Sequence, residues 1–147
     1  LFYSPLTYTP HWEIELNLME TYLRSGWEVV LLKCDADLPA CLANPYHSFA
    51  VCLECKTRKN AGIKWIGKNR IKIKPFYKIT GENKAEIDNL ENFQIDSLKQ
   101  LKEIEIDGSD IGMSALSTAI TCLRESEIDV KEHQKLLKNL LVSAAIT

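Results

Sequence analysis

The spacing of apolar residues predicts that the chain begins with a strand, a helix and a second strand. Residues 1–3 form a short apolar run that a Ser-Pro pair ends, as at the end of a buried strand. From His11 onward, apolar residues recur at spacings of three and four, which is typical of an amphipathic helix, and Gly26 marks its end. Residues 27–32 then have the composition of a strand that is buried on both faces. We therefore expect a right-handed βαβ unit in an open parallel α/β sheet with flanking helices.

The middle of the chain is predicted to continue this alternation. Residues 57–66 have a helical composition, and Ile71, Ile73 and Phe76 suggest a third strand. Residues 80–91 are polar and mixed, which predicts a loop with a short helix.

Three further helical segments are predicted near the end of the chain. Apolar residues repeat at three-residue steps within residues 95–104, which indicates one or two helical turns. Ser109 or Asp110 is expected to cap the next helix, and Asp129 with Glu132 has the form of a capping box before the last one.

The length and composition are those of one globular domain. With 147 residues, 46% of them hydrophobic and 26% charged, we expect a single domain over residues 1–147 with a cysteine-rich insertion at 34–55. Apolar residues still accumulate at 142–146, so we expect the chain to be the N-terminal part of a longer protein. The chain has no secretory signal pattern and no apolar run long enough to cross a bilayer, which favours a cytoplasmic location.

Charge is distributed unevenly along the chain. The net charge of -2 excludes a globally basic nucleic-acid binder, but residues 56–78 hold nine Lys or Arg and no acid, whereas residues 81–110 are predominantly acidic. Two interpretations are open for the basic segment. It is either one solvated face of the fold, or a nucleic-acid site, because Trp65, Phe76 and Tyr77 interleave with its basic residues.

Four cysteines lie close together in the segment CDADLPACLANPYHSFAVCLEC. Cys52 and Cys55 have the C-x-x-C spacing that lets two thiolates face one zinc ion, and Cys34 and Cys41 would complete a tetrahedral set, with His47 as a spare ligand. Such a site has no open position for water, so zinc would be structural. Free thiols, and disulfide or thioredoxin-like redox use, are the alternatives.

Other chemical motifs are sparse. His11 stands where the first strand leads into the first helix, and a histidine there can reach a ligand at the sheet edge and accept a proton from a hydroxyl. The alternative is a helix N-terminal residue bonded to its own turn. The chain contains no G-x-G-x-x-G after the first strand, no P-loop motif and no G-x-S-x-G, so these nucleotide and hydrolase classes lose support.

Several phrases resemble known proteins. The phrase Arg24-Ser25-Gly26-Trp27-Glu28-Val29, which closes the first helix and enters the second strand, resembles the start of a GT-B glycosyltransferase. Trp27 replaces the histidine that is common in that phrase, and the glycine-rich turn before the first helix is missing. The phrases KCDADLPAC, CLEC and DGSDIGMSALSTAITCLRES are similar to cysteine-containing proteins of bacterial capsule and surface-polysaccharide biosynthesis.

The resemblance implies a Rossmann-like N-terminal half that binds a sugar or lipid-linked saccharide acceptor, with His11 at the position of the catalytic base. It also implies a C-terminal domain that holds the nucleotide-sugar donor, no turnover by this chain alone, and peripheral association with a membrane. Nucleic acid is not the partner expected from it. A zinc-stapled nucleic-acid-binding module and a noncatalytic interaction module are the competing hypotheses.

Overall fold

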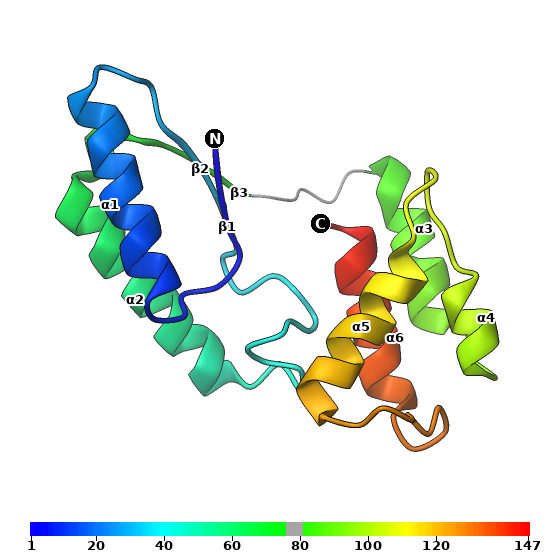
Figure 1. Ribbon diagram of the computed structural model, residues 1–147. Helices are drawn as coiled ribbons and strands as arrows, with labels where there is room; N and C mark the ends of the chain where they lie inside the picture. Colours follow the sequence, from blue (N-terminus) through cyan, green and yellow to red (C-terminus); the bar gives the residue numbers. More distant parts are fainter. Residues whose placement is uncertain (76–80) are drawn as a thin grey trace. The chain divides into compact units, whose positions relative to one another are not determined.

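The computed structural model describes residues 1–75 and 81–147, and for residues 81–83 and 86 it describes the backbone alone. The chain divides into two compact units (Figure 1). The first, which we call the sheet unit, contains Leu1–Asp37 and Ser48–Tyr77. The second, the helical unit, contains Leu38–His47 and Lys78–Thr147.

The sheet unit contains a small parallel sheet of three strands. They are β1 (Phe2–Ser4), β2 (Val30–Lys33) and β3 (Lys72–Pro75), in the order β1-β2-β3. Phe2 pairs with Leu31, and Leu31 pairs with Ile73. This small parallel sheet with its flanking helices confirms the predicted parallel α/β arrangement. Of the residues predicted to form the third strand, Phe76 lies outside the described part of the chain.

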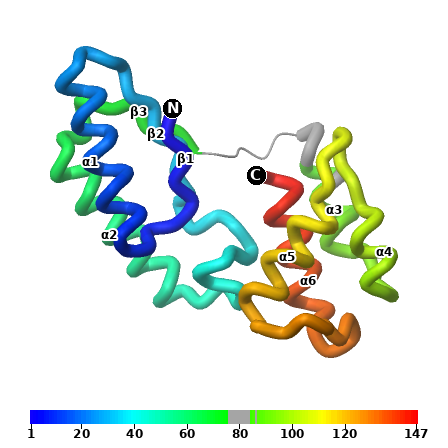
Figure 2. The backbone as a smooth tube through the Cα atoms, in the orientation of Figure 1, coloured from blue at the N-terminus to red at the C-terminus, as the bar shows by residue number. Residues whose placement is uncertain are grey.

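Two helices pack on the sheet and on each other. Helix α1 (His11–Arg24) connects β1 to β2, and α2 (Phe49–Ile66) leads through the short 3₁₀ helix η1 (Lys68–Arg70) to β3. They run side by side (Figure 2). Their shared core with the sheet is formed by buried residues from every layer: Trp12, Leu16, Met19, Val29, Leu31, Ile63, Ile66 and Ile71.

The close approach of α1 and α2 depends on Gly62. A Cβ atom at this position would lie 2.7 Å from both Leu16 Cδ1 and Trp12 Nε1. Only the absence of a side chain lets the indole of Trp12 rest on the backbone of α2. Gly62 therefore sets the spacing between the two helices.

Helix α2 begins earlier than its sequence indicates. We expected a helix over residues 57–66, but it starts at Phe49, directly after Ser48. The side chains of Phe49 and Leu53 are 78% and 50% exposed, so the first turns bury no apolar stripe. Without that periodicity, the sequence pattern gives no helical signal for this part of the chain.

The helical unit consists of α3 (Gly81–Asn92), α4 (Leu98–Lys102), α5 (Ile111–Leu123) and α6 (Gln134–Ala145). Helices α5 and α6 lie side by side (Figure 1). The core between the helices includes residues with almost no exposed surface: Leu101, Ala119, Leu137 and Leu141.

The two predicted caps have different outcomes. Asp110 caps α5, because its carboxylate accepts a hydrogen bond of 3.0 Å from the amide of Met113. Asp129 accepts from the amides of Lys131 and Glu132, at 2.8 and 3.2 Å. However, α6 begins only at Gln134, so Asp129 stabilises a turn before the helix and the predicted start of that helix was wrong.

The cysteine-rich segment is shared between the units. Cys34, Cys52 and Cys55 belong to the sheet unit, whereas Cys41 lies in the 38–47 stretch of the helical unit. That stretch is held by Ser143, whose hydroxyl donates to the carbonyl of Ala40 at 2.7 Å and accepts from its amide at 3.1 Å. The single domain expected over residues 1–147 stays a prediction.

No helix among the described residues is long and apolar enough to cross a membrane.

Candidate functional site

A cavity of about 540 Å³ lies within the sheet unit. It begins at the carboxyl end of β2 and extends along α2 to η1. Its walls come from β2 and the loop after it, from α2 and η1, and from β3: Lys33, Asp35, Asn60, Ile63, Lys64, Lys68 and Ile73. Its size is in the range of pockets that hold small molecules, and the carboxyl end of a parallel strand is where α/β folds commonly place ligands.

Asp35 organises the basic groups at one end of this cavity. Its carboxylate forms ion pairs with Lys33 at 3.0 Å and with Lys56 at 3.1 Å. The pKa of the Asp35 carboxyl lies below its ordinary value, first because of the hydrogen-bonding contact with Lys33 and then because of Lys56. Asp35 therefore stays ionised at neutral pH, and the ammonium groups of Lys33 and Lys56 already balance its negative charge.

The far end of the cavity carries the positive charge of Lys64 and Lys68. Lys64 and Lys68 are exposed lysines that form no ion pair with any residue in the described ranges. Buried Ile63 and half-buried Ile73 supply an apolar wall between the charged ends, and Asn60 adds an amide. The arrangement suits a small polar ligand that carries negative charge and also has a carbon face.

Lys59 lies on the buried side of α2 and supports the strand ends. It is 1% exposed, and its ammonium group donates to the carbonyls of Ser4 at 2.9 Å, Pro5 at 3.3 Å and Cys34 at 3.5 Å. Burial lowers the pKa of this amine, and the nearby thiols of Cys55 and Cys34 act in the opposite direction. Lys59 thus fixes the carboxyl ends of β1 and β2 to α2.

The four predicted zinc ligands are distributed over different elements. Cys34 follows β2, Cys52 and Cys55 lie one turn apart in α2, and Cys41 exchanges backbone hydrogen bonds of 3.3 and 2.9 Å with Asn44. The thiol of Cys55 accepts a hydrogen bond of 3.3 Å from the hydroxyl of Thr7. Among the side chains that the structure describes, no three of His, Cys, Asp or Glu are grouped as a metal site requires.

The zinc staple at Cys34, Cys41, Cys52 and Cys55 accordingly stays a prediction. The spare ligand His47 is engaged elsewhere, since its Nδ1 lies 2.6 Å from the carbonyl oxygen of Leu38.

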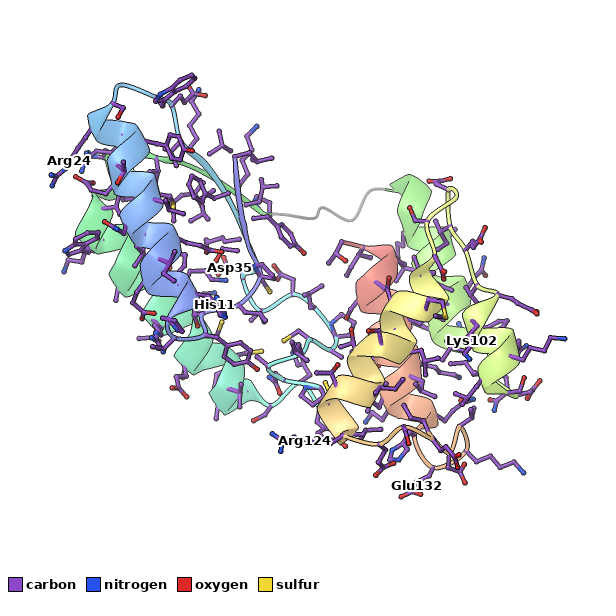
Figure 3. All side chains as sticks on the ribbon, viewed as in Figure 1. His11, Arg24, Asp35, Lys102, Arg124 and Glu132 are labelled. Carbon is purple, nitrogen blue, oxygen red and sulfur yellow. The ribbon has the colours of Figure 1, made fainter. Side chains whose placement is uncertain are left out.

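His11 is the first residue of α1 and is exposed. Figure 3 shows it at the start of α1, and Asp35 in the loop that follows β2. His11 does not line the cavity. Thr9 and Glu13, which flank His11 in sequence, both accept hydrogen bonds from Arg58 of α2, and this contact connects α2 to the start of α1. The role of His11 as a base stays a prediction.

The sequence analysis missed most of the residues that line the cavity. Asn60 and Lys64 are four residues apart in α2 and so share one helix face, which was a usable signal. The contribution of Lys33 and Ile73 depends on strand register, which becomes visible only in the sheet. The run of basic residues at 56–78 is visible in the sequence, but the pocket that Lys64 and Lys68 share is not.

A second cavity, of about 480 Å³, lies in the helical unit and includes Glu91, Lys135 and Lys138 among its lining residues. Here an acid accompanies the two lysines and no strand end contributes. The cavity of the sheet unit is therefore the stronger candidate for a ligand site.

Comparison with protein-family models, with curated proteins and with solved structures finds no match. The function has to be inferred from the geometry of the chain itself.

Proposed function

We propose that this chain is the acceptor-side domain of a glycosyltransferase of bacterial surface-polysaccharide biosynthesis, and that it holds a saccharide in the cavity of the sheet unit. The observation that carries the proposal is the β1-α1-β2-α2-β3 sequence of a parallel sheet with strand order β1-β2-β3. The same order begins one half of a doubly wound, Rossmann-like sheet.

The phrase at residues 24–29 leads from the end of α1 into β2, which is the position that the resemblance implies. Helix α1 ends at Arg24, Gly26 turns the chain with a φ of 82°, and buried Val29 leads into β2. A positive φ is readily adopted by glycine, so the turn between the helix and the strand depends on this residue. The position of the phrase supports the proposal.

The chemistry of the cavity is compatible with a saccharide. Asn60 and Asp35 offer amide and carboxylate groups that hydrogen-bond to hydroxyls, and Ile63 and Ile73 give an apolar surface for the C–H face of a sugar ring. The nucleotide-sugar donor is assigned to a further domain, so this chain binds acceptor without transferring sugar.

A nucleic-acid-binding module is the second candidate, because exposed basic residues and the 67%-exposed Trp65 lie along α2 and β3. Ion pairs weaken this alternative: Arg58 is paired with Glu13, Arg70 with Glu20, and Lys72 with Glu28. Basic groups already neutralised by the protein's own acids release fewer phosphate counterions on binding.

Saturation-transfer NMR with a panel of mono- and disaccharides, both phosphorylated and unphosphorylated, tests the proposal. We expect saturation to reach at least one saccharide, and Asn60→Ala to reduce it while Lys74→Gln, outside the cavity, leaves it unchanged. Absence of transfer to every saccharide, together with salt-sensitive binding of a single-stranded oligonucleotide, would refute the proposal in favour of the second candidate.

A further inference from the structure

Positively charged side chains outnumber negatively charged ones around the cavity. Three lysines line it, Lys33, Lys64 and Lys68, against a single carboxylate, that of Asp35. Asp35 is already paired both with Lys33 and with Lys56, which comes from outside the lining. The cavity therefore retains positive charge at Lys64 and Lys68 that no acid in the described ranges neutralises.

These lysines are placed so that a ligand can approach them. Lys64 lies in the last turn of α2 and Lys68 opens η1, with Gly67 turning the chain between them at a φ of 98°. Both side chains are exposed, and both contribute to the same cavity wall. Ammonium groups of this kind bind phosphate as point charges with rotatable donors.

The middle of the cavity is different. Asn60, Ile63 and Ile73 form a neutral wall with one amide and two apolar side chains. A bare phosphate ion would contact only the lysine end and leave this wall, and most of the 540 Å³, unused. The cavity thus has a neutral section between Lys64 and Lys68 on one side and the ion-paired Asp35 on the other.

From this arrangement we infer that the cavity takes a phosphate ester of a saccharide, with the phosphate between Lys64 and Lys68 and the sugar ring against Asn60, Ile63 and Ile73. This inference rests on the proposed function and names the class of acceptor. A terminal phosphate and the diphosphate of a lipid-linked saccharide share the same recognition chemistry.

Calorimetric titration of the 147-residue chain with four probes tests the inference. The probes are a hexose 1-phosphate, the same hexose without phosphate, inorganic diphosphate and a single-stranded oligonucleotide. We expect the hexose phosphate to bind at least tenfold more tightly than the free hexose. Lys64→Gln and Lys68→Gln should each weaken it about tenfold, as the loss of one charge-assisted hydrogen bond implies.

Lys74→Gln is the matched control. Lys74 is an exposed lysine of β3 that forms no ion pair in the described ranges and does not line the cavity, so its replacement removes the same charge elsewhere. We expect it to change the affinity for hexose phosphate less than twofold. Inorganic diphosphate should bind more weakly than hexose phosphate, because it cannot use the neutral wall.

The outcomes separate the two proposals. Equal affinity for hexose and hexose phosphate, insensitive to Lys64→Gln and Lys68→Gln, overturns the inference and leaves saccharide binding standing. Diphosphate binding as tightly as hexose phosphate also overturns it, as does equal weakening by all three lysine variants. Binding of the oligonucleotide alone, or of no probe, overturns the inference; the saccharide panel described above decides the proposed function separately.

Discussion

Lys59 donates a hydrogen bond of 2.9 Å to the backbone carbonyl of Ser4, 55 residues away in sequence, and both residues are 1% exposed. A buried ammonium group thus holds the point where β1 ends. The carbonyl of Cys34, just after β2, accepts from the same nitrogen at 3.5 Å. The ends of two strands depend on one side chain of α2.

Replacing Lys59 with methionine keeps an unbranched side chain that is one atom shorter and removes its donors. The buried carbonyl of Ser4 then loses this donor, so we expect Lys59→Met to lower the free energy of unfolding by about 1–3 kcal/mol. Urea denaturation followed by circular dichroism measures the change. Lys64→Met, at an exposed position of the same helix, should stay within about 0.5 kcal/mol of wild type, and equal effects of the two variants would contradict the role given to Lys59.

Because α1 and α2 are in contact at Gly62, replacing this glycine with alanine should destabilise the protein. By helix propensity alone, Gly62→Ala would stabilise α2 by about 1 kcal/mol. Because the new Cβ would lie 2.7 Å from Leu16 and Trp12, we expect the opposite sign, a net loss of about 1–3 kcal/mol in the free energy of unfolding. Thermal or chemical denaturation shows whether the free energy of unfolding falls or rises. The exposed Thr57→Ala, also in α2, serves as the control, and a stabilised Gly62→Ala protein would mean that the helices do not pack as described.

Asp35 should contribute to stability in a pH-dependent manner. Its folded pKa lies below the ordinary value of 3.8 because of Lys33 and Lys56. The contribution is therefore complete above the unfolded pKa and is lost as the pH falls through the folded one. Since the carboxylate is partly exposed, we expect Asp35→Asn to cost less than about 1 kcal/mol at pH 7 and nothing once the pH lies below the folded pKa.

Urea titrations of wild type and Asp35→Asn at a series of pH values from neutral to strongly acid measure this difference. Asp37→Asn, two residues further along and without an ion pair in the described ranges, removes the same charge as a control. A gap between wild type and Asp35→Asn that stays constant down to the lowest pH would show that the ion pairs contribute nothing.

The zinc prediction calls for its own measurement. If Cys34, Cys41, Cys52 and Cys55 hold a structural zinc, protein purified without chelator should contain about one zinc per chain by elemental analysis. Cys52→Ser and Cys55→Ser should lose it, and Cys122→Ser, in α5, should retain it. Wild-type protein that is folded and free of metal would refute the predicted structural zinc site.

The parallel sheet was predictable because its elements follow simple periodicities. The apolar spacing after His11 and the apolar residues at 29–32 each correspond to one element of the structure, α1 and β2. Asp110 was likewise recognisable as a cap, since a side-chain acceptor before an apolar helical pattern is a local signal. Features that depend only on residues close together in sequence could therefore be predicted.

The site was less predictable because it depends on contacts between distant segments. Lys59, Ile63 and Ile66 have the i, i+4, i+7 spacing of one helix face, so the burial of Lys59 had a signal in the sequence. Its carbonyl partners had none, since they come from the ends of β1 and β2. The cavity similarly requires side chains from β2, α2 and β3 to meet, which no local pattern encodes.

The central claim, that the cavity of the sheet unit is the ligand site, is tested most directly by chemical-shift mapping. The ¹⁵N-labelled chain would be titrated with a hexose 1-phosphate while its backbone amide signals are followed. We predict that the largest shifts occur at Lys33, Asn60, Lys64 and Lys68, with saturation at a common dissociation constant. Shifts confined to the residues of the helical unit, with those four amides unchanged at saturating ligand, would contradict the claim.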